Sequence, residues 1–189
     1  PFRAAFDLPP GTPTIDLRLA VRHDGRELLA YQPAERAKHE PPAPATEPPS
    51  PERIATLEEL YLTGLHLQQY RHTTRRPEDY YREALRRDPG ASRCNTAMGE
   101  WHLRRGELPA AERHLRAALA RLTVRNPNPR HGEASYLLGL VLRLRGDLAG
   151  ADEAFGKAGW DGPFASAADT ARAEIAAVRG DVPHAMAFL

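Results

Sequence analysis

The chain has 189 residues, 41% of them hydrophobic and 27% charged, with a net charge of +1. This is the composition of an ordinary globular protein, and no apolar run approaches the ~18 residues that suggest a membrane span. There is no secretory signal, so we expect a cytoplasmic protein without membrane insertion. A single cysteine, Cys94, excludes an internal disulfide and a Cys-based zinc site.

The charge is unevenly spread along the sequence. Residues 71–130 hold 14 arginines against seven acids, whereas residues 131–189 hold five basic groups against eight acids. Solvated helix faces with salt bridges between neighbours explain this pattern, and so does a preference for acidic partners in the middle of the chain.

Residues 1–32 are expected to form a β-hairpin, the remnant or edge of an upstream β domain. Apolar and polar residues alternate from Thr14 to Arg22, which is typical of a half-buried strand. Asp24-Gly25 favours a tight turn because both positions tolerate a positive φ, and residues 27–31 then return as the second strand. A lone hairpin is marginal in water, so we expect it to close a missing β domain or to pack against the first helices.

Residues 33–51 contain seven prolines and predict a stiff linker in polyproline geometry, or a strap laid on the domain that follows. A ligand for an SH3-type domain is the third possibility. Ser50-Pro51-Glu52 predicts the start of the first helix, with Ser as the N-cap and Pro in the first turn.

Residues 52–189 repeat one spacing. An apolar residue precedes Gly, a second Gly follows after seven residues, Ala five later, a large apolar residue four later, and then a second Ala. The copies span 98–118 and 138–158, with a weaker copy at 173–189. A pair of short helices that cannot bury its apolar face alone must stack on similar pairs. The repeats are expected at 53–90, 91–123, 131–163 and 165–189, the last one truncated, so the array is expected to continue past Leu189. The helices are expected at about 78–87, 91–105, 108–122, 132–145, 148–158, 165–179 and 182–189.

This spacing resembles the tetratricopeptide repeat (TPR) family. The resemblance implies an all-α fold, a right-handed superhelix of stacked helical hairpins. It also implies that small residues in the first helices (Gly64, Gly99, Gly139, Ala173) let the second helices approach, and that large residues fill the contact (Tyr81, Leu115, Phe155, Leu189). The family's terminal proline matches Pro89 and Pro163.

The chain departs from the family pattern between the second and third repeats. Gly99 and Gly139 are 40 residues apart, whereas TPR units repeat every ~34. The excess lies in residues 124–131, which are either a solvated spacer or a binding element. The hairpin, linker and repeats together also resemble the downstream part of large multidomain bacterial proteins, in which a β-sandwich region tied to carbohydrate metabolism precedes a TPR array.

The TPR resemblance implies a concave groove, lined by the first helices, that binds a peptide or a partner domain. The expected groove residues are Tyr61, Leu65, Gln68, Thr96, Glu100, Leu103, Tyr136, Leu140 and Arg143. The same surface is also suited to the chain's own linker, to an upstream domain or to a second copy in a homo-oligomer. Tyr61 and Leu65 stand where the family's carboxylate clamp has Lys and Asn, so we expect no such clamp.

Catalysis, cofactors and metals are not expected. The sequence has no HExxH, no His pair four residues apart, no GxSxG and no phosphate-binding glycine loop. Cys94, near a helix start, is interpreted as a buried structural thiol. Arginine pairs such as Arg75-Arg76 suggest RNA, but the aromatic residues Tyr61 and Tyr136 are not matched in the second repeat, so nucleic acid is not expected. The predicted function is a protein-interaction scaffold, and the alternative is a non-catalytic accessory region of a carbohydrate-active protein.

Overall fold

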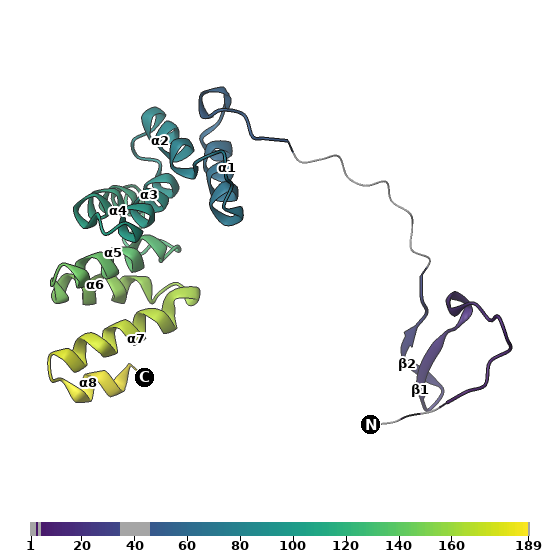
Figure 1. The fold of residues 1–189 in the computed structure, drawn as a ribbon. Coiled ribbons are helices and arrows are strands. Elements are labelled where there is room, and N and C mark those ends of the chain that lie inside the picture. The colour runs from purple at the N-terminus through teal and green to yellow at the C-terminus, as the bar shows by residue number, and fades with distance from the viewer. Residues whose placement is uncertain (1–2, 4, 35–45, 189) are drawn as a thin grey trace. The chain divides into compact units, whose positions relative to one another are not determined.

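The computed structural model describes residues 3, 5–34 and 46–188, and the chain divides into two compact units, Pro1–Thr46 and Glu47–Leu189. Within these described residues, the first unit holds a two-stranded antiparallel sheet and the second holds eight α-helices (Figure 1). Most of the proline-rich linker and Leu189 lie outside the described residues, and so do the predictions made for them.

The hairpin forms where the sequence predicts it, but it is shorter and has no core. β1 (Leu19–His23) pairs with β2 (Arg26–Tyr31) through a turn in which Asp24 and Gly25 have φ of 49° and 76°. The start of the predicted strand is wrong: Thr14–Asp16 is a single 3₁₀ turn, because Pro13 has its φ fixed and its carbonyl accepts from the amide of Asp16 at 3.1 Å.

The half burial expected of the first strand, against an upstream β domain or the first helices, stays a prediction. The register places Leu19 opposite Tyr31 and Val21 opposite Leu29, so these four side chains share one face of the hairpin. All four are exposed. Alternation along a strand reports which residues share a face, and it carries no information on what covers that face.

The predicted start of the first helix is wrong by six residues, nearly two helical turns. Pro51–Arg53 (η2) forms one 3₁₀ turn, and α1 (Leu57–Tyr70) begins after Thr56, whose Oγ1 accepts from the amide of Glu59 at 3.1 Å. The break between them buries Ile54 in the core. Arg87 Nη1 donates to the carbonyl oxygen of Ile54 at 2.7 Å, which ties this segment to the second helix.

The other helices follow the predicted pairs within a few residues. They are α2 (Pro77–Arg87), α3 (Ser92–Arg104), α4 (Leu108–Leu122), α5 (Glu133–Leu144), α6 (Leu148–Ala158), α7 (Gly162–Val178) and α8 (Val182–Ala187). α7 begins three residues before its predicted start and takes Pro163 into its first turn, where a proline loses no hydrogen bond. Consecutive helices pair, and each pair stacks on the next along the chain (Figure 1).

The close contacts within each helix pair are those the spacing predicts. A Cβ atom built on Gly64 would lie 2.5 Å from Cε1 of Tyr81, one on Gly99 would lie 2.5 Å from Cγ of Leu115, and one on Gly139 would lie 2.6 Å from Cε1 of Phe155. The three large side chains are fully buried. The small-to-large pairing of the first three repeats is therefore confirmed, and it fixes which face of each first helix turns away from its partner.

The fold is thus all-α in its second unit, an array of TPR-type helical hairpins, preceded by a short β-hairpin. Two apolar clusters form its core, one around α1–α3 and one around α4–α7. Because α3 contacts α5 and α5 contacts α7, the first helices of successive repeats lie next to one another and build a shared surface.

Candidate functional site

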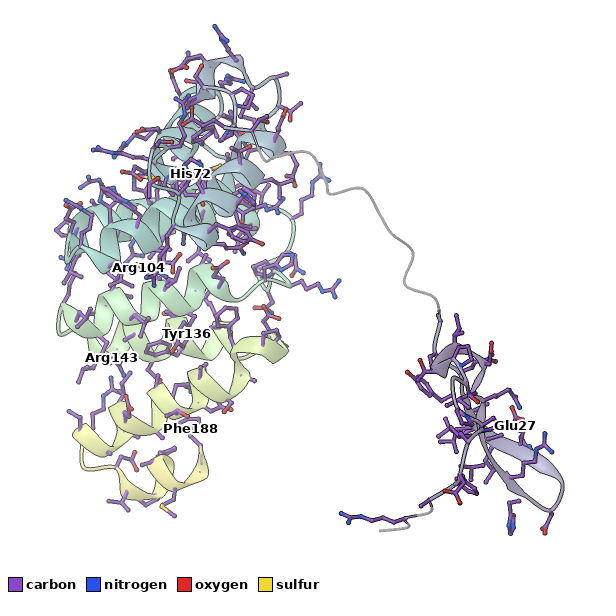
Figure 2. All side chains as sticks on the ribbon, turned by 45° about the vertical axis from the view of Figure 1, so that its right-hand side comes forward. Glu27, His72, Arg104, Tyr136, Arg143 and Phe188 are labelled. Atoms are coloured by element: carbon purple, nitrogen blue, oxygen red, sulfur yellow. The ribbon has the colours of Figure 1, made fainter. Side chains whose placement is uncertain are left out.

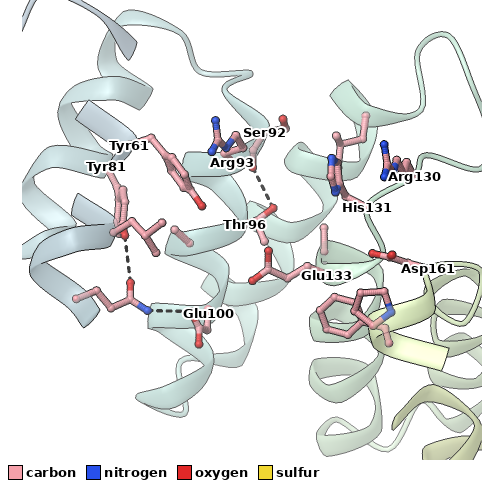
Figure 3. A pocket seen from close by; sticks show the side chains of 17 residues that line it. Tyr61, Tyr81, Ser92, Arg93, Thr96, Glu100, Arg130, His131, Glu133 and Asp161 are labelled. Atoms are coloured by element: carbon pink, nitrogen blue, oxygen red, sulfur yellow. Dashed lines mark hydrogen bonds between the residues drawn. The ribbon is translucent and has the colours of Figure 1, made fainter. Parts of the chain in front are cut away.

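The first-helix face of the array holds a cavity of about 790 Å³ (Figure 3). Its walls come from α1, α3, the beginnings of α5 and α7, and the loop before α5. The aromatic and aliphatic side chains in it are Tyr61, Leu65, Tyr81, Leu122 and Phe164, and the charged ones are Arg93, Glu100, Arg130, Glu133 and Asp161. Apolar and polar side chains line it in similar measure, and a concave site that offers both is suited to binding a ligand.

Five of the nine expected groove residues line this cavity. They are Tyr61, Leu65, Gln68, Thr96 and Glu100, all from the first two repeats.

The other four expected residues do not line the cavity. Leu103, Tyr136 and Leu140 are half-buried and pack against the core cluster around α5. Arg143 pairs with Glu174 of α7 and lies 5.9 Å from the ring centre of Phe155 (Figure 2). α7 packs on α5 and engages this part of its surface, which the single-repeat pattern does not reveal.

A hydrogen-bonded chain holds the floor of the cavity. Tyr81 Oη donates to Gln68 Oε1 at 3.1 Å, and Gln68 Nε2 donates to Glu100 Oε2 at 3.1 Å. Arg104 then donates to the other oxygen of Glu100 at 2.6 Å. Burial raises the pKa of Tyr81, so its hydroxyl stays protonated and remains a donor. Gln68 and Glu100 are therefore held in one orientation before any partner binds.

Arg93 is already engaged on the upper wall. Its guanidinium lies 4.0 Å from the ring centre of Tyr61, and Nη1 donates to both carboxylate oxygens of Glu58 at 2.6 and 2.7 Å. Glu58 and Arg93 occupy the same position in successive repeats, six residues before Gly64 and Gly99. The bond between them therefore links equivalent positions of the first and second repeats.

Glu133 is the third member of this series, six residues before Gly139. Its side chain points into the cavity (Figure 3), and within the described residues it makes no hydrogen bond or ion pair. The side chain of Glu133 remains accessible to solvent, but neighbouring protein atoms take the place of part of its surrounding water. This desolvation raises the pKa of Glu133, the nearby charge of Glu100 raises it further, and His131 opposes the shift.

The sequence pattern did not predict the part of the cavity wall that lies outside the first helices. Tyr81 comes from a second helix, Arg130 and His131 from the insertion, and Asp161 and Phe164 from the turn before α7 and from α7 itself. Asp161 Oδ2 accepts from the amide of Gly132 at 2.8 Å, so the turn and the insertion are joined at the cavity. Only Glu133 had a usable signal, its alignment with Glu58 and Arg93.

The other candidate reactive groups, the Cys94 thiol and the possible metal ligands, do not form a reactive site in the described residues. Desolvation raises the pKa of the buried Cys94 thiol to about 11, so little thiolate forms near neutral pH. Nowhere in residues 3, 5–34 and 46–188 do three His, Cys, Asp or Glu side chains gather closely enough to hold a metal ion. No helix in the same described ranges is long and apolar enough to cross a membrane.

Comparison with known proteins relates the chain to others by fold. No protein family model matches the sequence. The crystal structure of MamA, a TPR-containing protein, matches with a TM-score of 0.58 and 21% identity, over 70% of this chain and 73% of that chain. MamA 41-end from Desulfovibrio magneticus RS-1 matches with a TM-score of 0.56 and 22% identity, over 70% of this chain and 71% of that chain. At this identity the likeness establishes the TPR-like fold and nothing about the partner.

Proposed function

We propose that this chain is a non-catalytic interaction scaffold that binds an extended segment of a partner protein in the cavity on its first-helix face. The cavity carries the proposal because it lies where successive first helices meet and is walled by Tyr61, Tyr81 and Phe164. Aromatic side chains supply large contact areas with little conformational entropy to lose, which suits recognition of a peptide.

The charges of the cavity favour a peptide with a basic side chain. Arg93 is paired with Glu58, whereas Glu133 has no partner among the described residues and Glu100 lies close enough to raise its pKa. A lysine or arginine side chain placed beside Glu133 would supply the partner that it lacks and offset the nearby charge of Glu100. Arg130 also lines the cavity, and its positive charge would repel a strongly basic peptide. We therefore expect the bound peptide to carry only one or two basic side chains.

The test is a selection of displayed random dodecapeptides on the immobilised full chain, followed by affinity measurements on the enriched peptides. We expect apolar residues flanking one lysine or arginine. Replacement Glu133→Gln should weaken these peptides about fivefold, since a partly desolvated ion pair contributes about 1 kcal/mol. Glu153→Gln is the matched control, because Glu153 is 72% exposed on α6 and does not line the cavity.

A second pair of variants tests the aromatic wall. Tyr61→Ala should weaken the same peptides, whereas Tyr70→Ala on the same helix should not, because Tyr70 is exposed and does not line the cavity. Enriched peptides that are acidic, or that bind Glu133→Gln and the parent equally well, would contradict the proposal. A failed selection combined with retention on a glycan array would favour the accessory role in carbohydrate metabolism, and concentration-dependent mass in light scattering would favour a second copy as the occupant.

A further inference from the structure

The insertion that sets this chain apart from a regular TPR array builds a second cavity. Residues 123–132 connect α4 to α5, and their end is held tightly against α6. The amide of Gly132 donates to Asp161 Oδ2 at 2.8 Å, and a Cβ atom at Gly132 would lie 2.7 Å from the carbonyl oxygen of Ala158. Only glycine allows this approach. The end of the loop is therefore anchored, and between the loop and helices α4, α5 and α6 lies a cavity of about 260 Å³.

The lining of this second cavity is amphipathic. Its apolar side chains are Leu119 and Ala120 of α4, Leu138 of α5, and Pro127 and Pro129 of the loop. Its charged or titratable side chains are Arg116, His131 and Lys157, and no carboxylate lines it. At roughly 30 Å³ for each water of the liquid, the volume equals about eight or nine water molecules, the size of a small organic ligand.

The positive charge of this cavity is only partly neutralised. Arg116 Nε lies 2.7 Å from Glu112, but Arg145 pairs with the same carboxylate, so one acid serves two guanidinium groups. Lys157 pairs with Glu153 at 2.9 Å in an exposed contact between residues four apart on α6, a type worth only about 0.3–0.5 kcal/mol. An anion in the cavity can therefore recruit both cations at small cost.

The hydroxyl of Ser135 adds a directed donor. Ser135, on the first turn of α5, lines the cavity with only 4% of its surface exposed. Its hydroxyl makes no hydrogen bond to any of the residues that the structure describes. Because this hydroxyl is free to donate, an anionic oxygen in the cavity can accept a hydrogen bond from it.

From this arrangement we propose that the second cavity binds a small amphipathic carboxylate, with its carboxylate toward Arg116, Lys157 and Ser135 and its apolar part between Leu119, Leu138 and the loop prolines. The carboxylate belongs either to a free metabolite-sized acid or to an aspartate or glutamate side chain of another protein. The proposal does not depend on the peptide groove, because the groove's aromatic wall and Glu133 take no part in it.

The test uses the full chain and three probes of defined chemistry: benzoate, its neutral counterpart benzamide, and the capped dipeptide acetyl-Leu-Glu-amide. Binding is measured by titration in heteronuclear NMR, following the backbone amides of the loop and of Ser135. We expect benzoate or the dipeptide to shift these amides with saturation in the millimolar range, and benzamide to bind at least fivefold more weakly. Tighter binding of benzoate identifies a free acid as the ligand type, and tighter binding of the dipeptide identifies a protein side chain.

Substitutions locate the site. Arg116→Gln and Ser135→Ala should each weaken the better probe at least threefold, whereas Arg179→Gln, on an exposed residue after α7, should not. Amide spectra that match the parent away from the substituted residue establish that each variant is folded. The proposal is overturned if benzamide binds as well as benzoate, if neither carboxylate shifts the loop amides at 10 mM, or if the folded Arg116 and Ser135 variants bind like the parent.

Discussion

Gly139 offers the sharpest test of how the helix pairs are held together. A methyl group there would lie 2.6, 2.7 and 2.9 Å from three ring carbons of Phe155, whereas carbon atoms in ordinary contact are about 3.5–4.0 Å apart. The ring is fully buried and would have to move by about 1 Å into packed surroundings. Overpacking of this kind costs about 1–3 kcal/mol. Replacement Gly139→Ala also gains about 1 kcal/mol of helix propensity, so the net loss of stability should be about 0–2 kcal/mol.

Gly156, on the partner helix α6, is the matched control. A Cβ atom there would meet nothing closer than the guanidinium of Arg172 at 3.7 Å, an ordinary contact. Gly156→Ala therefore gains helix propensity without a clash and should stabilise the chain by about 0.5–1 kcal/mol. Because both variants gain the same propensity, their difference measures the overpacking alone, about 1–3 kcal/mol.

The assay is urea unfolding followed by far-UV circular dichroism, with thermal unfolding as a second measure. Gly139→Ala should melt about 3–9 °C below Gly156→Ala, taking roughly 3 °C for each kcal/mol in a domain of this size. Phe155→Leu should be less destabilising in the Gly139→Ala background than in the parent, by at least 0.5 kcal/mol, since the smaller side chain relieves the clash. Equal or greater stability of Gly139→Ala relative to Gly156→Ala would refute the proposed packing of small against large residues.

Two further predictions concern buried groups. Glu83 accepts hydrogen bonds from Arg86 and Arg87, which lower its pKa to about 2. A carboxyl whose pKa is lower in the folded chain stabilises the fold at pH values above its unfolded pKa, near 4.5, and this stabilisation is lost as the pH falls toward 2. Glu83→Gln should therefore be less stable than the parent at pH 7 and should lose less stability between pH 4.5 and 2.5. Parallel pH profiles of the two proteins in urea unfolding would contradict this. Cys94 should react with a disulfide reagent at pH 8 only as fast as the chain unfolds, because its buried thiol has a pKa of about 11, and rapid labelling of the folded chain would show that it is accessible.

The sequence was most informative where contacts are local. Gly99 and Leu115, or Gly139 and Phe155, are 16 residues apart and belong to one hairpin, so a spacing repeated in several copies identifies them. Helix ends that rest on turn chemistry were also close to their predicted positions, since Gly106 and Gly146 have the positive φ that follows a helix end. The start of α1 was missed because both Ser50 and Thr56 have the character of an N-cap and only Thr56 makes the hydrogen bond.

The candidate site was less predictable because it depends on contacts between repeats. Tyr61 and Thr96 line the cavity as expected from their place in the first helices, whereas Tyr136, at the equivalent place in the third repeat, packs on Phe155 and Phe164. Phe164 reaches Tyr136 because α7 begins earlier than its pattern suggests. A repeat pattern specifies each unit and its internal contacts, but the exposure of a first helix depends on the unit that follows it.

Two features distinguish this surface, and the insertion at 124–131 supplies the second of them. Arg93 turns back to Glu58 and so leaves Glu133, its equivalent in the next repeat, without a partner among the described residues. The longer connection before Glu133 also brings His131 to a position where it lines the groove cavity and the second cavity together. His131 is therefore a residue that the two cavities share. Residues of the insertion line both cavities, so substitutions there are expected to change ligand specificity with little effect on the repeated helix pairs.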